Sequence, residues 1–208
     1  MPKQNRVTPF SNLIATPARG TLMGNRGCLH DGQKQIRRRF VGKRWIICVL
    51  EFKGRRCRIM APGHYTQLFF LDEATALAAG HRPCAECQRD RFDLFRETWA
   101  KANPRLSATR RPSATDLDQT LHGERTAASG RAGPSCDAPE TLPDGALVTD
   151  DGETAYLVLG NKLLLWTPYG YERPGRVVRY PVRVLTPASV VRTLAVGYPV
   201  GVHSSAFR

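Results

Sequence analysis

The 208-residue sequence lacks any apolar run approaching the ~20 residues that a helix needs to cross a bilayer. Its first residues, MPKQNRVTPF, also lack the apolar stretch of a secretory signal. We therefore expect a cytoplasmic protein without a membrane partner. In that reducing compartment the six cysteines are expected to be free thiols or metal ligands rather than disulfides.

Acidic residues are scarce in the first third of the chain. Residues 1–60 carry 14 Lys and Arg but only Asp31 and Glu51, which is a net charge of +12 out of +13 for the whole chain. Such a concentration of positive charge favours a polyanionic partner. Nucleic acid, with DNA first, is expected ahead of a membrane surface because no amphipathic or lipidation signal accompanies the charge. A solvated basic surface without a partner is the alternative interpretation.

Common catalytic motifs are also missing. The sequence has no G-x-S-x-G, no Walker A loop, no H-E-x-x-H and no G-x-G-x-x-G followed by a suitable acid. One segment, DLDQTLHGER, places His122, Glu124 and Arg125 within a helical turn, and a nuclease-like hydrolase would need such groups. Residues at i and i+2 point to different helix faces, so a solvated helix is the favoured interpretation. Whether the chain is an enzyme stays open, and a binding role is preferred.

What the sequence does have is a C-x2-C pair, Cys84 and Cys87, in HRPCAECQRD. The pair lies at a turn that leads into a predicted helix. A structural zinc ion takes four Cys or His ligands in a tetrahedron, and a turn of this kind supplies two of them. The start of a helix also favours the negative charge of a thiolate. The pair therefore predicts half of a zinc site.

Four groups compete for the other half of the zinc site. Cys28 and His30 stand in a Gly-flanked turn, GNRGCLH, where alternate residues can reach a common ion. Cys57 follows the turn KGRR, whereas Cys48 lies inside an apolar strand, where a buried inert thiol is expected. Cys57 is the main substitute for Cys28 or His30. The favoured set of ligands is Cys28, His30, Cys84 and Cys87.

The stretch LFFLDEATALAAGHRPCAEC (68–87) resembles the end of the zinc-binding N-terminal domain of the Ada-type DNA methylphosphotriester repair proteins. The likeness is strong over about 20 residues and loose over residues 20–100, and the C-terminal third is unmatched. The resemblance implies a zinc site that includes an earlier C-x3-C pair, whose first cysteine accepts a methyl group from DNA. This sequence departs there, because Cys57 has about the right spacing but Lys53 occupies the other position. The resemblance thus implies zinc, with methyl transfer as an alternative function.

Two basic stretches, KQIRRRFVGKRW and FKGRRCR, surround the candidate ligands in sequence. Lys and Arg neutralise phosphates and release counterions, while Phe40 and Trp45 offer rings that either stack on unpaired bases or anchor the segment. The anchoring role is favoured for Trp45, which begins an apolar strand. The expected nucleic-acid-binding residues are Arg37, Arg38, Arg39, Lys43, Arg44, Lys53, Arg55 and Arg56.

The patterns predict an α+β protein with a zinc-stapled module, residues 1–104, and a β-rich domain of unknown role, residues 142–208. Residues 105–141 are rich in Ser, Pro, Gly and Ala and indicate a linker that contains one short helix. A strand over 45–52, the turn KGRR and a second strand, CRIMAP, are expected to form a basic hairpin. Helices are expected over 71–80, over 89–104 with a packed stripe of Phe92, Phe95 and Trp99, and within 187–199.

Overall fold

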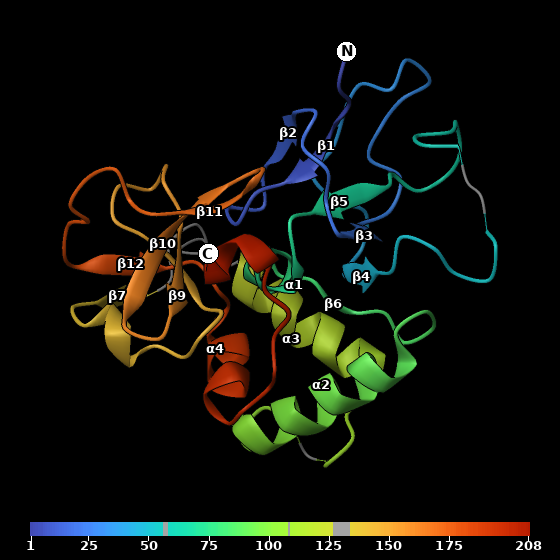
Figure 1. Cartoon of the computed structure of the whole chain (residues 1–208). Coiled ribbons are helices and arrows are strands. Elements are labelled where there is room, and N and C mark those ends of the chain that lie inside the picture. Colours follow the sequence, from blue (N-terminus) through green and yellow to red (C-terminus); the bar gives the residue numbers. More distant parts are fainter. Residues whose placement is uncertain (56–57, 108, 127–133) are drawn as a thin grey trace.

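The structure is a computed structural model that describes residues 1–55, 58–107, 109–126 and 134–208. The described residues form helices and two six-stranded sheets, so the expected α+β class is confirmed. Figure 1 shows one sheet built from the N-terminal part of the chain and one from the C-terminal part, on two sides of a group of helices.

The N-terminal sheet has short strands and mixed pairing, in the order β2-β1-β5-β3-β4-β6. Strand β4 pairs antiparallel with β3 on one side and parallel with the edge strand β6 on the other. The sheet therefore brings residues near 47 beside residues near 83. Its strands are β1 (Gln4–Val7), β2 (Leu13–Ala15), β3 (Leu22–Asn25), β4 (Ile46–Cys48), β5 (Leu68–Phe70) and β6 (Arg82–Pro83).

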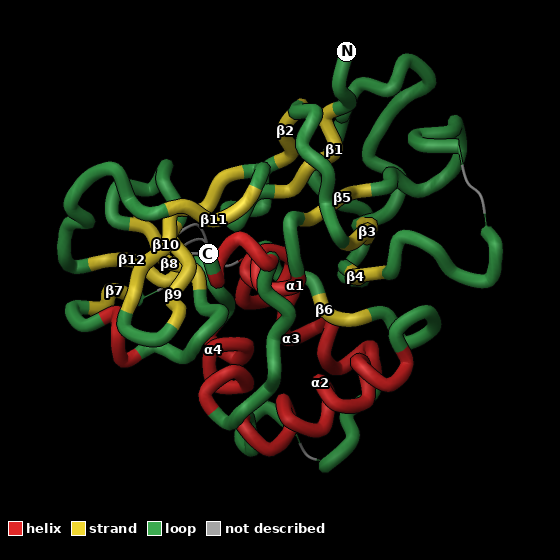
Figure 2. The backbone as a smooth tube through the Cα atoms, viewed as in Figure 1, coloured by secondary structure: helices red, strands yellow, loops and turns green. Residues whose placement is uncertain are grey.

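The C-terminal sheet is antiparallel in all of its described pairings, in the order β11-β10-β9-β8-β12-β7. Strands β9 and β10 form a hairpin that is joined at Gly160, whose φ is +58°. Figure 2 shows these strands as long neighbouring segments. The strands are β7 (Ser135–Cys136), β8 (Leu147–Thr149), β9 (Tyr156–Leu159), β10 (Lys162–Thr167), β11 (Gly170–Glu172) and β12 (Val182–Val184).

The expected helices are confirmed. Helix α1 begins after Asp72, whose carboxylate accepts a hydrogen bond from the Thr75 N–H at 2.8 Å. The stripe of Phe92, Phe95 and Trp99 on α2 is fully buried, as its spacing predicted. The helices are α1 (Glu73–Ala78), α2 (Arg89–Ala102), α3 (Ala114–Thr126) and α4 (Ala188–Ala195), with single 3₁₀ turns η1 (Pro139–Thr141) and η2 (Ser204–Phe207).

The basic hairpin is not confirmed. Strand β4 ends at Cys48, and residues 58–67 contain no strand. The turn itself exists, because Lys53 and Gly54 have positive φ values and Arg55 N–H donates to the carbonyl of Phe52 at 3.0 Å. The hairpin fails because both edges of β4 are already paired with β3 and β6, which leaves no place for a partner from residues 58–62.

Helix α3 is the helix expected inside the linker, and it packs into the molecule. Its Leu117 and Leu121 side chains are fully buried, and Asp118 forms two hydrogen bonds with Arg82 of β6 at 3.0 and 2.8 Å. A buried, bidentate ion pair of this kind fixes the orientation of both partners. The helix therefore holds the edge strand of the N-terminal sheet.

One buried cluster of apolar side chains joins the two sheets. It includes Ile47 and Leu68 from the N-terminal sheet together with Val148 and Val184 from the C-terminal sheet. Helix α1 lies at this junction, where the buried carboxylate of Glu73 accepts hydrogen bonds from the Tyr198 hydroxyl and the Gly201 N–H. Residues near the C-terminus thus complete a buried hydrogen-bond network on helix α1.

Candidate metal centre

The parallel pairing of β4 with β6 positions the candidate metal ligands. Ile46 pairs with Arg82 and Ile47 with Pro83. Cys48, the last residue of β4, therefore lies beside Cys84, the residue that follows β6. The pairing continues through the Cys84 N–H, which donates to the carbonyl of Ile47 at 2.8 Å. A turn over 84–88 then brings Cys87 back toward the same position, just before α2 begins at Arg89.

Three thiols converge at this point. The Sγ atoms of Cys48, Cys84 and Cys87 all lie within 4.8 Å of one another. Cys48 and Cys84 are buried, and Cys87 is half-buried. Sulfur ligands of a tetrahedral zinc ion, each about 2.3 Å from the metal, are about 3.8 Å apart, so small side-chain movements would suffice. The three side chains are therefore close enough to hold a metal ion.

Backbone N–H groups point at the sulfurs. The Glu86 N–H donates to Cys84 Sγ at 3.4 Å, and the Val49 N–H donates to Cys87 Sγ. Cys87 also precedes the N-terminus of α2, where the helix dipole favours negative charge. These donors stabilise thiolates rather than thiols, which is the form that a metal ion requires.

The three thiols shift one another's pKa values. A hydrogen bond from Cys48 lowers the pKa of the Cys84 thiol to about 5. The same hydrogen bond, together with burial, raises the pKa of Cys48 far above its ordinary value, and burial raises that of Cys87. Cys84 is therefore the thiol of the three that loses its proton most readily. A divalent ion would displace the remaining protons.

The structure brings together a different set of residues from the favoured one. Cys84 and Cys87 lie in the cluster, but the third thiol is Cys48, for which a buried inert role was expected. Cys28 Sγ lies 3.7 Å from the carbonyl of His30. The predicted substitute ligand, Cys57, lies outside the described residues.

His30 uses both ring nitrogens elsewhere. Its Nδ1 lies 2.6 Å from the Thr66 hydroxyl and its Nε2 lies 3.2 Å from the carbonyl of Ala61. Because a carbonyl only accepts, Nε2 carries the proton and Nδ1 accepts from Thr66. Binding a metal would cost His30 one of these hydrogen bonds, so the structure gives it a role in holding the 61–66 loop.

Sequence reasoning missed Cys48 because its partner strand is formed by residues 36 positions further along the chain. Two facts could have indicated it. Cys48 lies in the apolar run WIICVL, and Cys84 follows the short segment Arg82–Pro83. Only the register between those segments makes the cysteines neighbours, and no local pattern states that register.

The expected nucleic-acid-binding residues fall into paired and unpaired groups. Arg37 forms an ion pair with Asp31, and Arg55 forms one with Glu86 at 2.8 Å. Lys53 lies over the ring of Phe52. The other four described residues of this expected set have exposed side chains that form no hydrogen bond or ion pair with the described part of the chain, namely Arg38, Arg39, Lys43 and Arg44. Arg56 lies outside the described residues.

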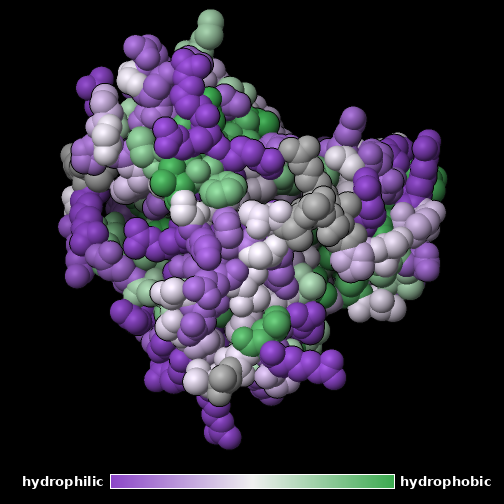
Figure 3. Space-filling model, turned by 180° about the vertical axis from the view of Figure 1, so that it is seen from behind, coloured by the Kyte–Doolittle hydropathy of each residue, from purple (hydrophilic) through white to green (hydrophobic). Residues whose placement is uncertain are grey.

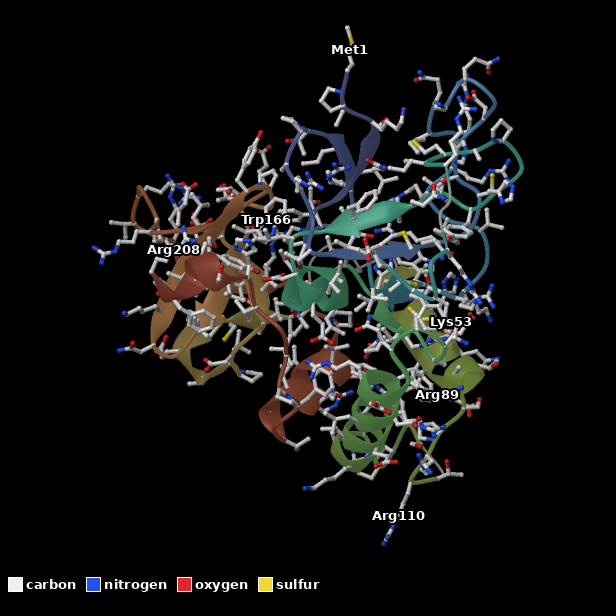
Figure 4. The ribbon with its side chains drawn as sticks, turned by 45° about the vertical axis from the view of Figure 1, so that its right-hand side comes forward. Met1, Lys53, Arg89, Arg110, Trp166 and Arg208 are labelled. Atoms are coloured by element: carbon white, nitrogen blue, oxygen red, sulfur yellow. The ribbon has the colours of Figure 1, made fainter. Side chains whose placement is uncertain are left out.

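The two basic stretches flank strand β4 in the sequence. Residues 37–44 precede β4 and residues 53–55 follow it, and the Arg55–Glu86 ion pair connects the second stretch to the turn between Cys84 and Cys87. Figure 4 shows Lys53 and Arg89 on the same side of the molecule. The second stretch therefore lies beside the turn that carries Cys84 and Cys87.

His122 and Glu124 have separate partners. The Glu124 carboxylate accepts hydrogen bonds from the N–H and hydroxyl of Ser189 at 2.9 and 2.6 Å, near the start of α4. The His122 ring packs edge-on against Phe40. In these positions Glu124 joins α3 to α4, and the two side chains do not form an acid–base pair.

Comparison with protein-family models, with curated proteins and with solved structures finds no match for this chain. No helix in the described ranges is long and apolar enough to cross a membrane. The face shown in Figure 3 is mostly hydrophilic, with small separate apolar patches. The arguments about function therefore depend on the geometry of the cluster and its surroundings.

Proposed function

We propose that the chain is a zinc protein that binds nucleic acid, and that the metal acts as a structural staple for the basic surface. One observation carries the proposal. Strand β4 ends in the ligand Cys48, and the strand lies between the two basic stretches. A metal that joins Cys48 to Cys84 and Cys87 would fix both stretches at once.

Zinc is the metal that this donor set favours. Thiolate ligands select soft or borderline metals, and a buried group of cysteines with N–H···S hydrogen bonds is typical of structural zinc sites. Three thiols leave one tetrahedral position for a further ligand. The sequence offers Cys57 for it, and Cys28 is the other candidate that sequence reasoning named.

Metal content tests this part of the proposal. The protein should purify with one zinc per chain, and Cys48→Ser, Cys84→Ser and Cys87→Ser should each lose it. Cys136→Ser is the matched control, because Cys136 lies in β7, away from the cluster, and should keep the metal. Cobalt substitution counts the thiolates through its charge-transfer absorption. A full metal content in Cys48→Ser would contradict the cluster.

The same experiment with Cys57→Ser and Cys28→Ser identifies the fourth ligand. Loss of zinc, or a fall in the cobalt–thiolate absorption, in one variant alone assigns the position to that residue. Unchanged spectra in both variants would assign it to a group other than these two cysteines.

Nucleic-acid binding follows from the unpaired cations. Arg38, Arg39, Lys43 and Arg44 are exposed, and none of them forms a hydrogen bond or ion pair with a described carboxylate. Arg44 acts on Asp118 only through its charge. Each phosphate that such a side chain neutralises contributes roughly −0.9 to the slope of log K against log salt on duplex DNA. Four contacts would therefore give a slope of about −3.6, with weak sequence preference.

Fluorescence anisotropy with a labelled duplex of random sequence, measured between low and high salt, tests this part. Binding should weaken steeply as salt rises and should change little between unrelated sequences. An affinity that does not depend on salt, or the absence of binding at low salt, would contradict the proposal. Competition with unlabelled RNA of the same length tests the expected preference for DNA.

Methyl transfer to a zinc-bound cysteine is the second candidate, and the family resemblance is its support. The burial of Cys48 and Cys84, which are 7% and 8% exposed, favours a structural role, because an attacking thiolate has to reach the methyl carbon. Incubation with methylphosphotriester DNA followed by mass spectrometry separates the two. A gain of one methyl group on a single cysteine would establish transfer, and an unchanged mass would leave the structural role.

A further inference from the structure

A cavity lies where the basic segment meets helix α3. Its volume is about 420 Å³, within the range typical of sites for small molecules. The end of β3, the loop over 41–44 and the first turns of α3 form its walls. It is separate from the thiol cluster, since none of Cys48, Cys84 and Cys87 lines it.

The lining combines two kinds of polar group. Asn25 and Gln119 offer amide groups, and side chains of this type pair with the edges of nucleobases. Lys43 and Arg44 offer cations suited to phosphate. In the described structure the side chains of Lys43, Arg44 and Gln119 have no hydrogen bond or ion pair, so all three are available to a ligand.

Two glycines shape the rim. Gly27 has a φ of +98°, and a Cβ placed there would lie 2.7 Å from Cβ of Val41. This close approach is reinforced by the Val41 N–H, which donates to the carbonyl of Arg26 at 2.7 Å. Gly42 has a φ of +72° and open space around it. A residue with a side chain would strain either position, so the backbone here is built to a defined shape.

Two cations, Arg26 and Arg125, lie next to residues that line the cavity. Arg26 is fully buried, and the Arg26 and Arg125 guanidinium groups lie 4.2 and 3.9 Å from the centre of the Trp45 ring. Neither forms an ion pair with a described carboxylate, and Arg26 Nη2 is buried without a hydrogen-bond partner. Burial and the charge of Arg125 lower the pKa of Arg26 to about 9. The adjacent cavity therefore lies in a positive field, which favours an anionic ligand.

An exposed aromatic ring stands next to the rim. Phe40 precedes Val41 and is held by ring contacts with Trp45 and His122, at centroid distances of 5.5 and 5.3 Å. Phe40 is 36% exposed to solvent. Rings placed in this way serve as stacking platforms for unpaired bases.

We infer that the cavity binds the base of one unpaired nucleotide. Asn25 and Gln119 contact the edge of that base, and Lys43 and Arg44 hold the flanking phosphates. The inference rests on the proposed function and names its substrate class as single-stranded nucleic acid or a duplex with an unpaired base. A paired base in a continuous duplex cannot enter such a cavity unless it is first unstacked.

The test compares a labelled single strand with the duplex of the same sequence, by anisotropy at one fixed salt concentration. The wild type should bind the single strand about tenfold more tightly, as expected for one recognised and stacked base. Gln119→Ala should remove most of that preference without weakening duplex binding, because Gln119 is exposed on α3 and carries no charge. Gln35→Ala, an exposed glutamine outside the cavity, is the matched control.

The outcomes separate the inference from the proposed function. Steep, salt-dependent binding with the same ratio of single-strand to duplex affinity in wild type and Gln119→Ala would overturn the cavity but leave the basic surface. No binding of either form at low salt would overturn both. Titration with nucleoside monophosphates, followed by Trp fluorescence, adds a direct reading. Saturable quenching of Trp fluorescence in the wild type that is weaker in Gln119→Ala would support binding in the cavity. An absence of quenching would count against it.

Discussion

The two sheets of this molecule have six strands each but are stabilised in different ways. In the C-terminal sheet, β8 to β11 pair antiparallel with their neighbours in the chain, and β12 pairs with the more distant β8 and β7. Val148, Leu157 and Val158 of this sheet are completely buried. Strands of the N-terminal sheet are two to four residues long, and long loops separate β3 from β4 and β4 from β5. Only the N-terminal sheet carries the thiol cluster.

This difference indicates which of the two sheets a bound metal ion would stabilise more. Short strands joined by long loops bury little apolar surface for each residue that they order, so folding them costs conformational entropy that packing does not offset. A metal ion that joins Cys48 to Cys84 ties together segments 36 positions apart. Most pairings of the C-terminal sheet instead join consecutive strands, β8 to β11, so a metal tie would contribute less there.

Loss of a metal ligand should give the largest effect. Because structural zinc contributes folding free energy directly, Cys84→Ala should lower the free energy of unfolding by about 5 kcal/mol or more, which is about 10–20 °C in Tm. Hydrogen exchange should show β3 and β4 losing protection before β9 and β10. Equal loss of protection in both sheets would break the comparison, and Cys136→Ala should change neither.

Removal of the Asp118 carboxylate should rank second. Asp118→Ala would leave Arg82 buried without its partner in the edge strand β6, and the expected cost is about 3–5 kcal/mol. Urea denaturation measures it. Asp116→Ala is the control, because Asp116 is exposed on the same helix, and a cost for Asp118→Ala no greater than that of Asp116→Ala would contradict the role given to this pair.

The C-terminal sheet has an ion pair whose loss should cost less. Hydrogen bonds from Arg176 lower the pKa of Asp150, so the pair stabilises the fold above the unfolded pKa, about 3.9, and its contribution disappears as pH falls through the lower folded value. At pH 7, Arg176→Ala should lower Tm, by less than Asp118→Ala does. Thermal melts of both proteins should converge once the pH falls below the lowered pKa of Asp150. A difference that persists at low pH would assign the effect to packing.

The smallest expected effect is on the salt dependence of DNA binding, and it should differ between cations that form an ion pair and cations that do not. Arg38→Ala should leave Tm unchanged and reduce the salt slope of DNA binding by about 0.9. Arg37→Ala should reduce it less, because Arg37 already pairs with Asp31. Arg173→Ala, near the C-terminal sheet, should have no effect. Equal reductions for Arg37, Arg38 and Arg173 would mean that net charge alone, and not the basic segment, governs binding.

Local patterns in the sequence predicted the helices. The helix over 71–80 and the stripe on α2 were readable because helix start and stop signals and helical periodicity act within a few residues. The Cys84–Cys87 pair was readable for the same reason. The pairing of β4 was not, because the turn at Lys53–Gly54 indicated a hairpin while distant strands occupied both edges of β4. The third thiol followed that register and could not be assigned without it.

The hydrogen bonds around α1 have a consequence for the order of synthesis. The buried carboxylates of Asp72 and Glu73 accept hydrogen bonds from the N–H groups of His203 and Gly201. While the chain is still being translated, both carboxylates exist long before these donors leave the ribosome. Until about residue 203 has emerged, both carboxylates lack these two donors, and a stop codon shortly before that point would remove one hydrogen bond from each of them.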